Sequence, residues 1–124
     1  MNIVQVLLII TSVALSSTAQ ILFKAGMVSP EVKAALSGGD LPTIFKTVAG
    51  SLNILLGLVC FGLSLAMWLL VLSRVPLSTA YPFVALGIAA TVFAGSTLFG
   101  ELLSVQKMAG VAFIMIGITL VARS

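Results

Sequence analysis

Long runs without a charged side chain fill most of this chain, and they constrain its fold more than any motif does. The first three runs cover residues 1–23, 47–73 and 75–100. A bilayer core about 30 Å thick needs roughly 20 helical residues to cross it, and each of these runs is longer. The fourth run, 108–122, has 15 residues, but Lys107 and Arg123 at its ends can extend their charged groups to the interfaces. The pattern therefore predicts an all-α integral membrane protein with four transmembrane helices.

The composition and charge agree with a membrane protein and argue against other classes. Hydrophobic residues make up 60% of the chain and charged residues 7%, whereas soluble domains carry about 25% charged residues. The net charge of +3 comes from scattered Lys and Arg residues rather than a basic cluster, so we predict no binding to nucleic acid. The chain has no His, and its one cysteine, Cys60, lies within an apolar run, so we expect neither a metal site nor a cofactor.

A single domain over residues 1–124 accounts for the whole pattern. We expect the four spans at about 3–25, 50–72, 76–98 and 104–122. Short turns between the later spans would make consecutive helices antiparallel neighbours. A cleaved signal peptide would begin with Lys or Arg and would have a shorter apolar segment. Because the basic start is missing, we interpret residues 3–25 as a retained helix.

The segment 27–46 is the one longer loop, and its sequence predicts a short helix inside it. Residues 29–31, Ser-Pro-Glu, provide the N-cap, the proline and the acidic residue typical of a helix start, and 38–39, Gly-Gly, would end the helix. We therefore expect a helix over 30–37, which either lies on the membrane surface or belongs to a plain solvated loop. A second helix start at 40–42 would run on into the second span.

The first span carries a stripe of polar side chains. Gln5, Ser12, Ser16, Gln20 and Lys24 follow one another at intervals of seven, four, four and four residues, which keeps them on one face of a helix. Ser12 and Ser16 either hydrogen-bond to a neighbouring helix, a common role in membranes, or line a transport path. Gln20 and Lys24 lie one turn apart near the membrane edge, and we predict that they form a site for an anion.

The second and third spans add candidates of a different kind. Asn53 and Trp68 lie at the two ends of a face of small and polar residues, although Trp68 also suits an interfacial aromatic belt. Tyr81 and Pro82 interrupt the backbone hydrogen bonding of the third span one turn inside the membrane. Such interruptions often line a cavity, and a simple packing kink is the alternative.

Acidic residues are absent from the interior of every span, which bears on the type of transport. A proton-coupled exporter of cations needs a carboxylate within the membrane, and the first span has none. Glu101 follows the third span, where we expect it at the surface with Lys107 as its nearest partner in sequence. We include Glu101 among the candidate substrate-binding residues.

Two glycines on the last span suggest an intermolecular contact. Gly110 and Gly117 are seven residues apart and share one helix face. Glycines at this spacing leave a smooth groove into which another helix can pack. We therefore predict that these two residues form a dimer interface.

Four stretches together resemble a known superfamily of transporters. They are 19–26 (AQILFKAG), 67–82 (MWLLVLSRVPLSTAYP), 99–101 (FGE) and 110–118 (GVAFIMIGI). The chain resembles the small four-helix members of the drug/metabolite transporter superfamily, and within it the small subunits of the 4-amino-4-deoxy-L-arabinose–phosphoundecaprenol flippase. The last stretch is also similar to the small multidrug resistance exporters, but the characteristic glutamate of their first helix is missing here. The 27–46 loop is longer than we expect for the flippase subunits.

The resemblance implies a multi-pass protein of the bacterial inner membrane that works as a homodimer or with a similar small subunit. It would move a polyprenyl-phosphate-linked sugar across the bilayer without catalysing a chemical step, with membrane lipids around it. Lys24, aided by Gln20, would neutralise the phosphodiester. The candidate substrate-binding residues are Ser16, Gln20, Lys24, Asn53, Trp68, Tyr81, Pro82 and Glu101. The alternatives are an exporter of cationic or polar metabolites and a membrane scaffold for a glycosyltransferase.

Overall fold

The computed structural model describes residues 2–123, and this part of the chain is helical throughout, with short connections and no strand. The helices are α1 (Ile3–Met27), α2 (Pro30–Gly38), α3 (Leu41–Ala49), α4 (Leu52–Leu72), α5 (Leu77–Ala80), a 3-10 helix η1 (Tyr81–Phe83), α6 (Val84–Leu98) and α7 (Val105–Arg123). The all-α fold class is therefore confirmed.

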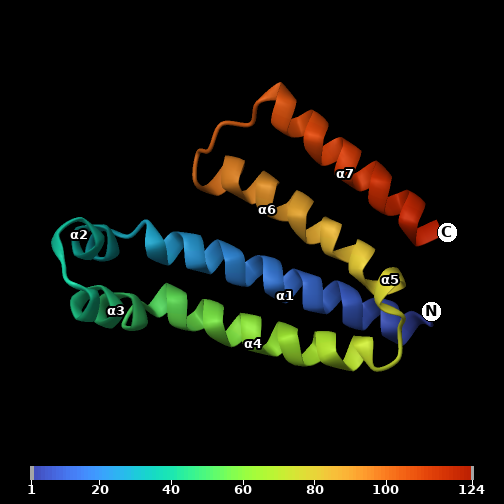
Figure 1. Ribbon diagram of the computed structural model, residues 1–124, viewed down its shortest axis with the longest axis horizontal. Coiled ribbons are helices and arrows are strands. Elements are labelled where there is room, and N and C mark those ends of the chain that lie inside the picture. Colours follow the sequence, from blue (N-terminus) through green and yellow to red (C-terminus); the bar gives the residue numbers. More distant parts are fainter. Residues whose placement is uncertain (1, 124) are drawn as a thin grey trace.

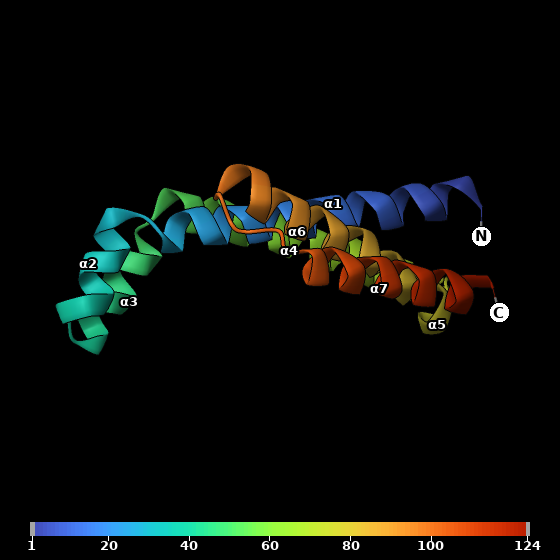
Figure 2. The same ribbon diagram turned by 90° about the horizontal axis from the view of Figure 1, so that it is seen from above.

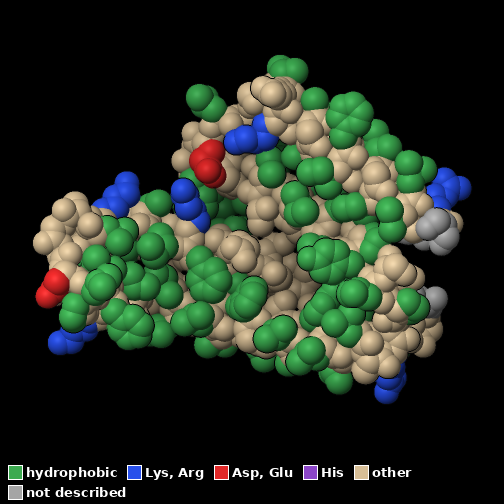
Figure 3. Space-filling model, viewed as in Figure 1, with side chains coloured by type: hydrophobic (Ala, Val, Ile, Leu, Met, Phe, Trp, Pro, Cys, Tyr) green, Lys and Arg blue, Asp and Glu red, His purple; other side chains and the backbone are tan. Residues whose placement is uncertain are grey.

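Three segments are long and apolar enough to cross a membrane. They are Ile3–Met27, Leu52–Leu72 and Leu77–Leu98, and they match three of the four predicted spans. The fourth apolar stretch, Val105–Val121, is shorter than these three. Its crossing of the bilayer remains a prediction. Figure 3 shows hydrophobic side chains spread over the visible face of the bundle, as a lipid environment requires.

The helices form a flat row in which each lies beside its neighbour (Figure 1). α1 and α4 run antiparallel side by side, α6 lies against α1, and α7 lies outermost against α6. The two termini lie near the same end of the long helices, and α2 and α3 lie at the opposite end. Seen from above, α2 and α3 bend away from the plane of the long helices (Figure 2).

Small residues allow α1 and α4 to approach closely. A Cβ atom on Gly57 would lie 2.8 Å from the ring of Phe23 and 3.2 Å from the carbonyl oxygen of Ala19, so a larger residue there would have to displace its neighbours. Farther along the pair, the hydroxyl of Ser12 donates to the carbonyl of Ser64 at 3.0 Å, and the hydroxyl of Ser64 donates to the carbonyl of Ser12 at 2.8 Å. Interhelical hydrogen bonds of this kind contribute about 0.6 kcal/mol each in membranes.

The loop between the first two spans contains two helices instead of the single short helix that we predicted. α2 corresponds to the predicted helix over 30–37. Asp40 caps the start of α3, and its carboxylate accepts the amide N–H of Thr43 at 3.2 Å. α3 does not continue into the second span as expected, because Ser51 adopts an extended backbone (φ −72°, ψ 125°) and separates it from α4. The sequence did not reveal this interruption, since Gly50 is tolerated within many helices.

The α2–α3 pair presents its apolar surface unevenly. α2 buries Val32 and Ala35 inside the protein. α3 instead leaves Leu41 81% exposed and Phe45 76% exposed. The apolar surface at this end of the bundle therefore belongs mainly to α3, and α2 adds Leu36, which is 48% exposed.

The predicted interruption of the third span is confirmed. Residues Tyr81–Phe83 form the 3-10 helix η1 between α5 and α6. Pro82 is buried, and its ring replaces the N–H that a continuous α-helix would use at this position. Beyond the interruption, α6 runs alongside α1 (Figure 1).

Candidate functional site

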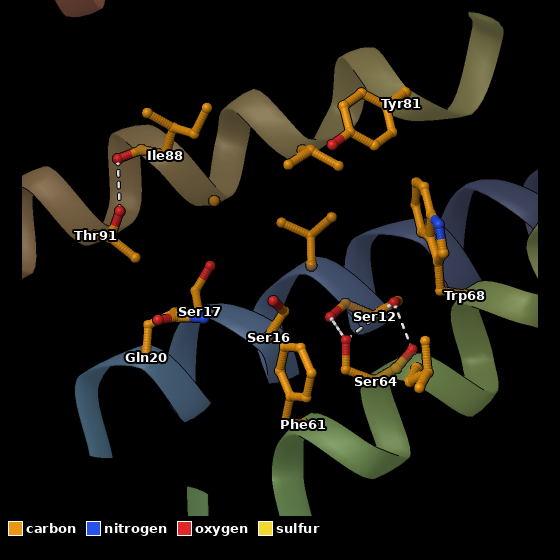
Figure 4. Close-up of a pocket in the computed structure, with 14 residues that line it drawn as sticks. Ser12, Ser16, Ser17, Gln20, Phe61, Ser64, Trp68, Tyr81, Ile88 and Thr91 are labelled. Atoms are coloured by element: carbon orange, nitrogen blue, oxygen red, sulfur yellow. Dashed lines mark hydrogen bonds between the residues drawn. The ribbon is translucent and has the colours of Figure 1, made fainter. Parts of the chain in front are cut away.

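A cavity of about 420 Å³ lies between α1, α4 and α6. Its size falls within the range of about 300–1,000 Å³ that is usual for small-molecule sites. The polar and aromatic residues of its lining are Ser12, Ser16, Ser17, Gln20, Phe61, Ser64, Trp68, Tyr81 and Thr91. Most of the remaining lining is aliphatic, so the cavity offers hydroxyl and amide groups on an apolar background (Figure 4).

Some residues of the polar stripe of α1 pack against α4, and others line the cavity. Ser12 is buried and hydrogen-bonded to Ser64, so its hydroxyl serves to hold α1 and α4 together. Ser16, Ser17 and Gln20 lie along the cavity wall (Figure 4). Within the described part of the chain, no hydrogen bond engages the hydroxyl of Ser16. Its hydroxyl is therefore available to a ligand.

Two aromatic rings close the cavity at the end nearer α5. Trp68 of α4 and Tyr81 of η1 meet edge to face, with ring centroids 6.2 Å apart and an interplanar angle of 70°. η1 places Tyr81 on the cavity side, and Tyr81 is 60% exposed. Pro82, the next residue, lines two other cavities that face α7 instead. The interruption of the third span thus supplies the cavity with Tyr81 and not with Pro82.

A ridge of small residues on α6 forms the wall opposite α1. Gly87, Thr91 and Gly95 follow one another every fourth residue, which places them on one helix face. A Cβ atom on Gly87 would lie 2.9 Å from the hydroxyl oxygen of Ser17, so the two helices are in close contact there. We did not identify this ridge from the sequence, although its four-residue spacing is visible in it.

Two further cavities lie toward the charged end of the bundle and share lining residues with the first. Gln20 and Thr91 also line a second cavity of about 150 Å³, which contains Lys24 and Glu101. Thr91 and Glu101 also line a third cavity of about 270 Å³, which contains Lys107. We call these three neighbouring cavities, which share lining residues, the groove. It runs from the aromatic pair past the polar stripe to the three charged side chains.

Glu101 reaches the groove because the connection between α6 and α7 folds back over α6. Gly100 adopts φ +66°, a left-handed conformation that favours glycine. The backbone N–H of Glu101 then donates to the carbonyl of Gly95 at 3.1 Å. The carboxylate lies directly on Gly95, where a Cβ atom would collide with Oε1.

The remaining predicted residues lie elsewhere. Asn53 is exposed near the start of α4 and lines none of these cavities. Gly110 and Gly117 face open space, because a Cβ atom on either would meet no atom within 4 Å. The structure therefore brings Ser16, Gln20, Lys24, Trp68, Tyr81 and Glu101 to one groove, adds Ser17, Thr91 and Lys107 to them, and leaves Asn53 and Pro82 outside.

Comparison with known proteins gives a consistent set of relatives. Residues 43–114 match the family model described as Small Multidrug Resistance protein. This match begins after α1, the helix in which the exporters' glutamate is missing. No solved structure gives a significant match.

Several curated relatives carry flippase names. The chain is 32% identical to the probable 4-amino-4-deoxy-L-arabinose-phosphoundecaprenol flippase subunit ArnF of Proteus mirabilis over 117 residues, which are 92% of this chain and 88% of that protein. The corresponding ArnF of Photorhabdus laumondii is 32% identical over 115 residues, 90% of this chain and 91% of that one. The probable subunit ArnE of Escherichia fergusonii is 44% identical over 69 residues, 56% of this chain, and the match spans 62% of its length.

Proposed function

Because the chain belongs to the small multidrug resistance family, we propose that it is a subunit of a flippase for a polyprenyl-phosphate-linked sugar in the bacterial inner membrane. The names of its relatives support an aminoarabinose-type sugar as the cargo. The observation that carries the proposal is the groove, in which Lys24 and Gln20 lie at one end of a polar path along α1.

Lys24 supplies the charge that the phosphodiester needs. An uncompensated charge at the centre of a bilayer costs about 2.5–3.5 kcal/mol on insertion scales. An ammonium group beside the phosphate removes part of that cost at the point where the head group leaves the interface. Gln20 lines both the main cavity and the cavity of Lys24, so its amide can bind the head group as the head group moves from one cavity to the other.

The main cavity suits a sugar rather than a cation. Ser16, Ser17, Gln20 and Thr91 offer donors and acceptors to sugar hydroxyls, and no charged residue lines this cavity. Trp68 and Tyr81 present ring surfaces to the apolar face of a pyranose ring. The polyprenyl chain stays in the surrounding lipid, against the outward-facing leucines of the helices.

A second subunit completes the assembly. α7 lies at the edge of the helix row, and Gly110 and Gly117 leave its outer face open. In this proposal α7 is the fourth membrane crossing, and its glycine face packs on a second copy or on a similar small subunit. Each subunit of this dimer keeps its own groove, with the outer helix surfaces facing the lipid.

Reconstituted vesicles test the function directly. The purified chain, alone and with a co-expressed similar subunit, is expected to translocate polyprenyl-phosphate-linked 4-amino-4-deoxy-L-arabinose and not to take up a quaternary ammonium ion. Gln20→Leu should lower translocation, while Thr18→Val should leave it unchanged, because the hydroxyl of Thr18 bonds only to the carbonyl of Ala14 in its own helix. Uptake of the ammonium ion without lipid translocation would favour the exporter alternative instead.

A further inference from the structure

Three charged side chains from distant parts of the sequence meet at one end of the groove. Lys24 comes from α1, Glu101 from the α6–α7 connection and Lys107 from the first turn of α7. Glu101 lines both the cavity of Lys24 and the cavity of Lys107. A carboxylate thus lies between two separate cavities, each of which contains one ammonium group.

The carboxylate is held in place without being neutralised by either lysine. Its backbone N–H bonds to the carbonyl of Gly95, and its side chain rests on the bare Cα of the same glycine. Within residues 2–123 no ion pair joins Glu101 to Lys24 or Lys107. The ammonium of Lys107 instead donates to the backbone carbonyl of Leu102 at 3.4 Å. Glu101 therefore keeps its charge available to a ligand.

This arrangement suits a zwitterionic ligand better than a simple anion. The two lysines attract a phosphodiester, whereas a carboxylate between them repels it. Like charges placed side by side repel each other. The carboxylate favours binding only if the ligand carries a positive group beside its phosphodiester. An amino sugar linked to a lipid phosphate has this pattern, with an ammonium and a phosphodiester on opposite sides of one ring.

Resting on the proposed function, we infer that Glu101 is a specificity-determining residue that accepts the ammonium group of an amino sugar, while Lys24, which lines the same cavity, holds the phosphodiester. Gly95 contributes to this site because its missing side chain leaves room for the carboxylate of Glu101. The chain thereby distinguishes an amino-sugar lipid from the same lipid with an uncharged sugar.

Binding to the full chain in lipid nanodiscs at neutral pH tests the inference. The two probes are polyprenyl-phosphate-linked 4-amino-4-deoxy-L-arabinose and the same lipid with unmodified L-arabinose. The parent protein is expected to bind the amino lipid about tenfold more tightly or better. Glu101→Gln should abolish this preference by weakening the amino lipid alone, and Gly95→Ala should do the same by displacing the carboxylate. Glu31→Gln, on the exposed surface of α2, is the matched control and should keep the preference.

The outcomes separate the inference from the function on which it rests. If the parent binds both lipids equally, or if Glu101→Gln keeps the preference or weakens both lipids alike, the role of Glu101 is wrong while the flippase proposal stands. If the parent binds neither lipid, both are overturned. The abundance and thermal stability of each variant in detergent show whether a loss of binding reflects misfolding. If Glu101→Gln misfolds, a folded Gly95→Ala protein still tests whether the preference for the amino lipid depends on the carboxylate.

Discussion

Small residues occur on two helix faces of this chain with opposite surroundings. On α4, the ring of Phe23 and the carbonyl of Ala19 occupy the space beside the Cα of Gly57. On α7, Gly110 and Gly117 meet no atom within 4 Å. None of the α7 side chains that the structure describes is buried, and cavities of about 200 and 280 Å³ separate α7 from η1 and α6.

The contrast shows what a glycine face means in this fold. In a membrane, helices associate through close van der Waals contact because lipid removes most of the hydrophobic driving force. The α1–α4 face uses its small residues for such contact within the chain. The α7 face has the same kind of pattern but no contact with another part of residues 2–123, and in the proposed assembly a second subunit covers it. One interface holds the subunit together, and the other is available for assembly.

The largest effect is expected from filling the α1–α4 face. Gly57→Leu would place a branched side chain where the Phe23 ring and the Ala19 carbonyl now lie, and overpacking of this kind costs about 1–3 kcal/mol. We expect a lower thermal unfolding midpoint and reduced abundance in membranes. Gly62→Leu on the same helix is the control, because a Cβ atom there meets nothing within 4 Å. Equal stability of the two variants would contradict the close packing of α1 and α4.

Filling the α7 face should separate assembly from folding. Cysteine at Ile114, between the two glycines, is expected to form a disulfide-linked dimer in membranes when Cys60 is replaced by serine. Gly110→Leu with Gly117→Leu should abolish this cross-link and leave abundance and thermal stability unchanged. Ala112→Leu, on the opposite side of α7, should preserve it. Persistent cross-linking in the double variant would place the dimer contact elsewhere.

An intermediate effect is expected at the interruption of the third span. Pro82→Ala restores the missing N–H, so the helix can straighten and carry Tyr81 away from Trp68. We expect the transport rate to fall by about tenfold, equivalent to about 1.4 kcal/mol, with abundance unchanged. Tyr81→Ala should reproduce the loss. Reduced abundance with normal activity per folded molecule would instead identify Pro82 as a packing residue.

The smallest effect concerns the cap of α3. Hydrogen bonds from the side chain and backbone of Thr43 hold the pKa of Asp40 below its ordinary value of 3.8. A folded-state pKa that is lowered in this way stabilises the fold above the ordinary pKa, and the contribution disappears as the pH falls through the folded value. The amide shift of Thr43 should therefore titrate with a midpoint below 3.8. In Asp40→Asn this titration should vanish while the groove is unaffected.

Local signals in the sequence were sufficient for most of the helices. Charge-free runs located α1, α4 and the α5–α6 segment, because the cost of placing charges in lipid forbids them there. Ser29 and Pro30 marked the start of α2, and Pro82 marked the interruption. These features depend only on neighbouring residues, so they can be read without knowing the tertiary structure.

The groove was less accessible to such reasoning. Gln20 and Lys24 stood out because they share a helix face, but their place in one cavity with Glu101 depends on how α6 aligns with α1. Hydrophobic periodicity identifies a helix face without fixing which residue of a neighbouring helix lies opposite. The fold-back of Glu101 also depends on Gly95 and on the left-handed conformation of Gly100, which act only together.

Lipid translocation by a charge variant of α1 tests the central claim most directly. Lys24→Met keeps the length and the apolar stem of the side chain but removes its charge. In reconstituted vesicles we expect it to insert normally and to translocate polyprenyl-phosphate-linked 4-amino-4-deoxy-L-arabinose at least about tenfold more slowly, a change of about 1.4 kcal/mol. Lys24→Arg should retain part of the activity, since it keeps the charge in a different geometry. Lys33→Met on α2 should behave like the parent. Translocation by Lys24→Met at the parental rate would contradict the account, because Lys24 would then be an interfacial anchor and the phosphate site would lie elsewhere.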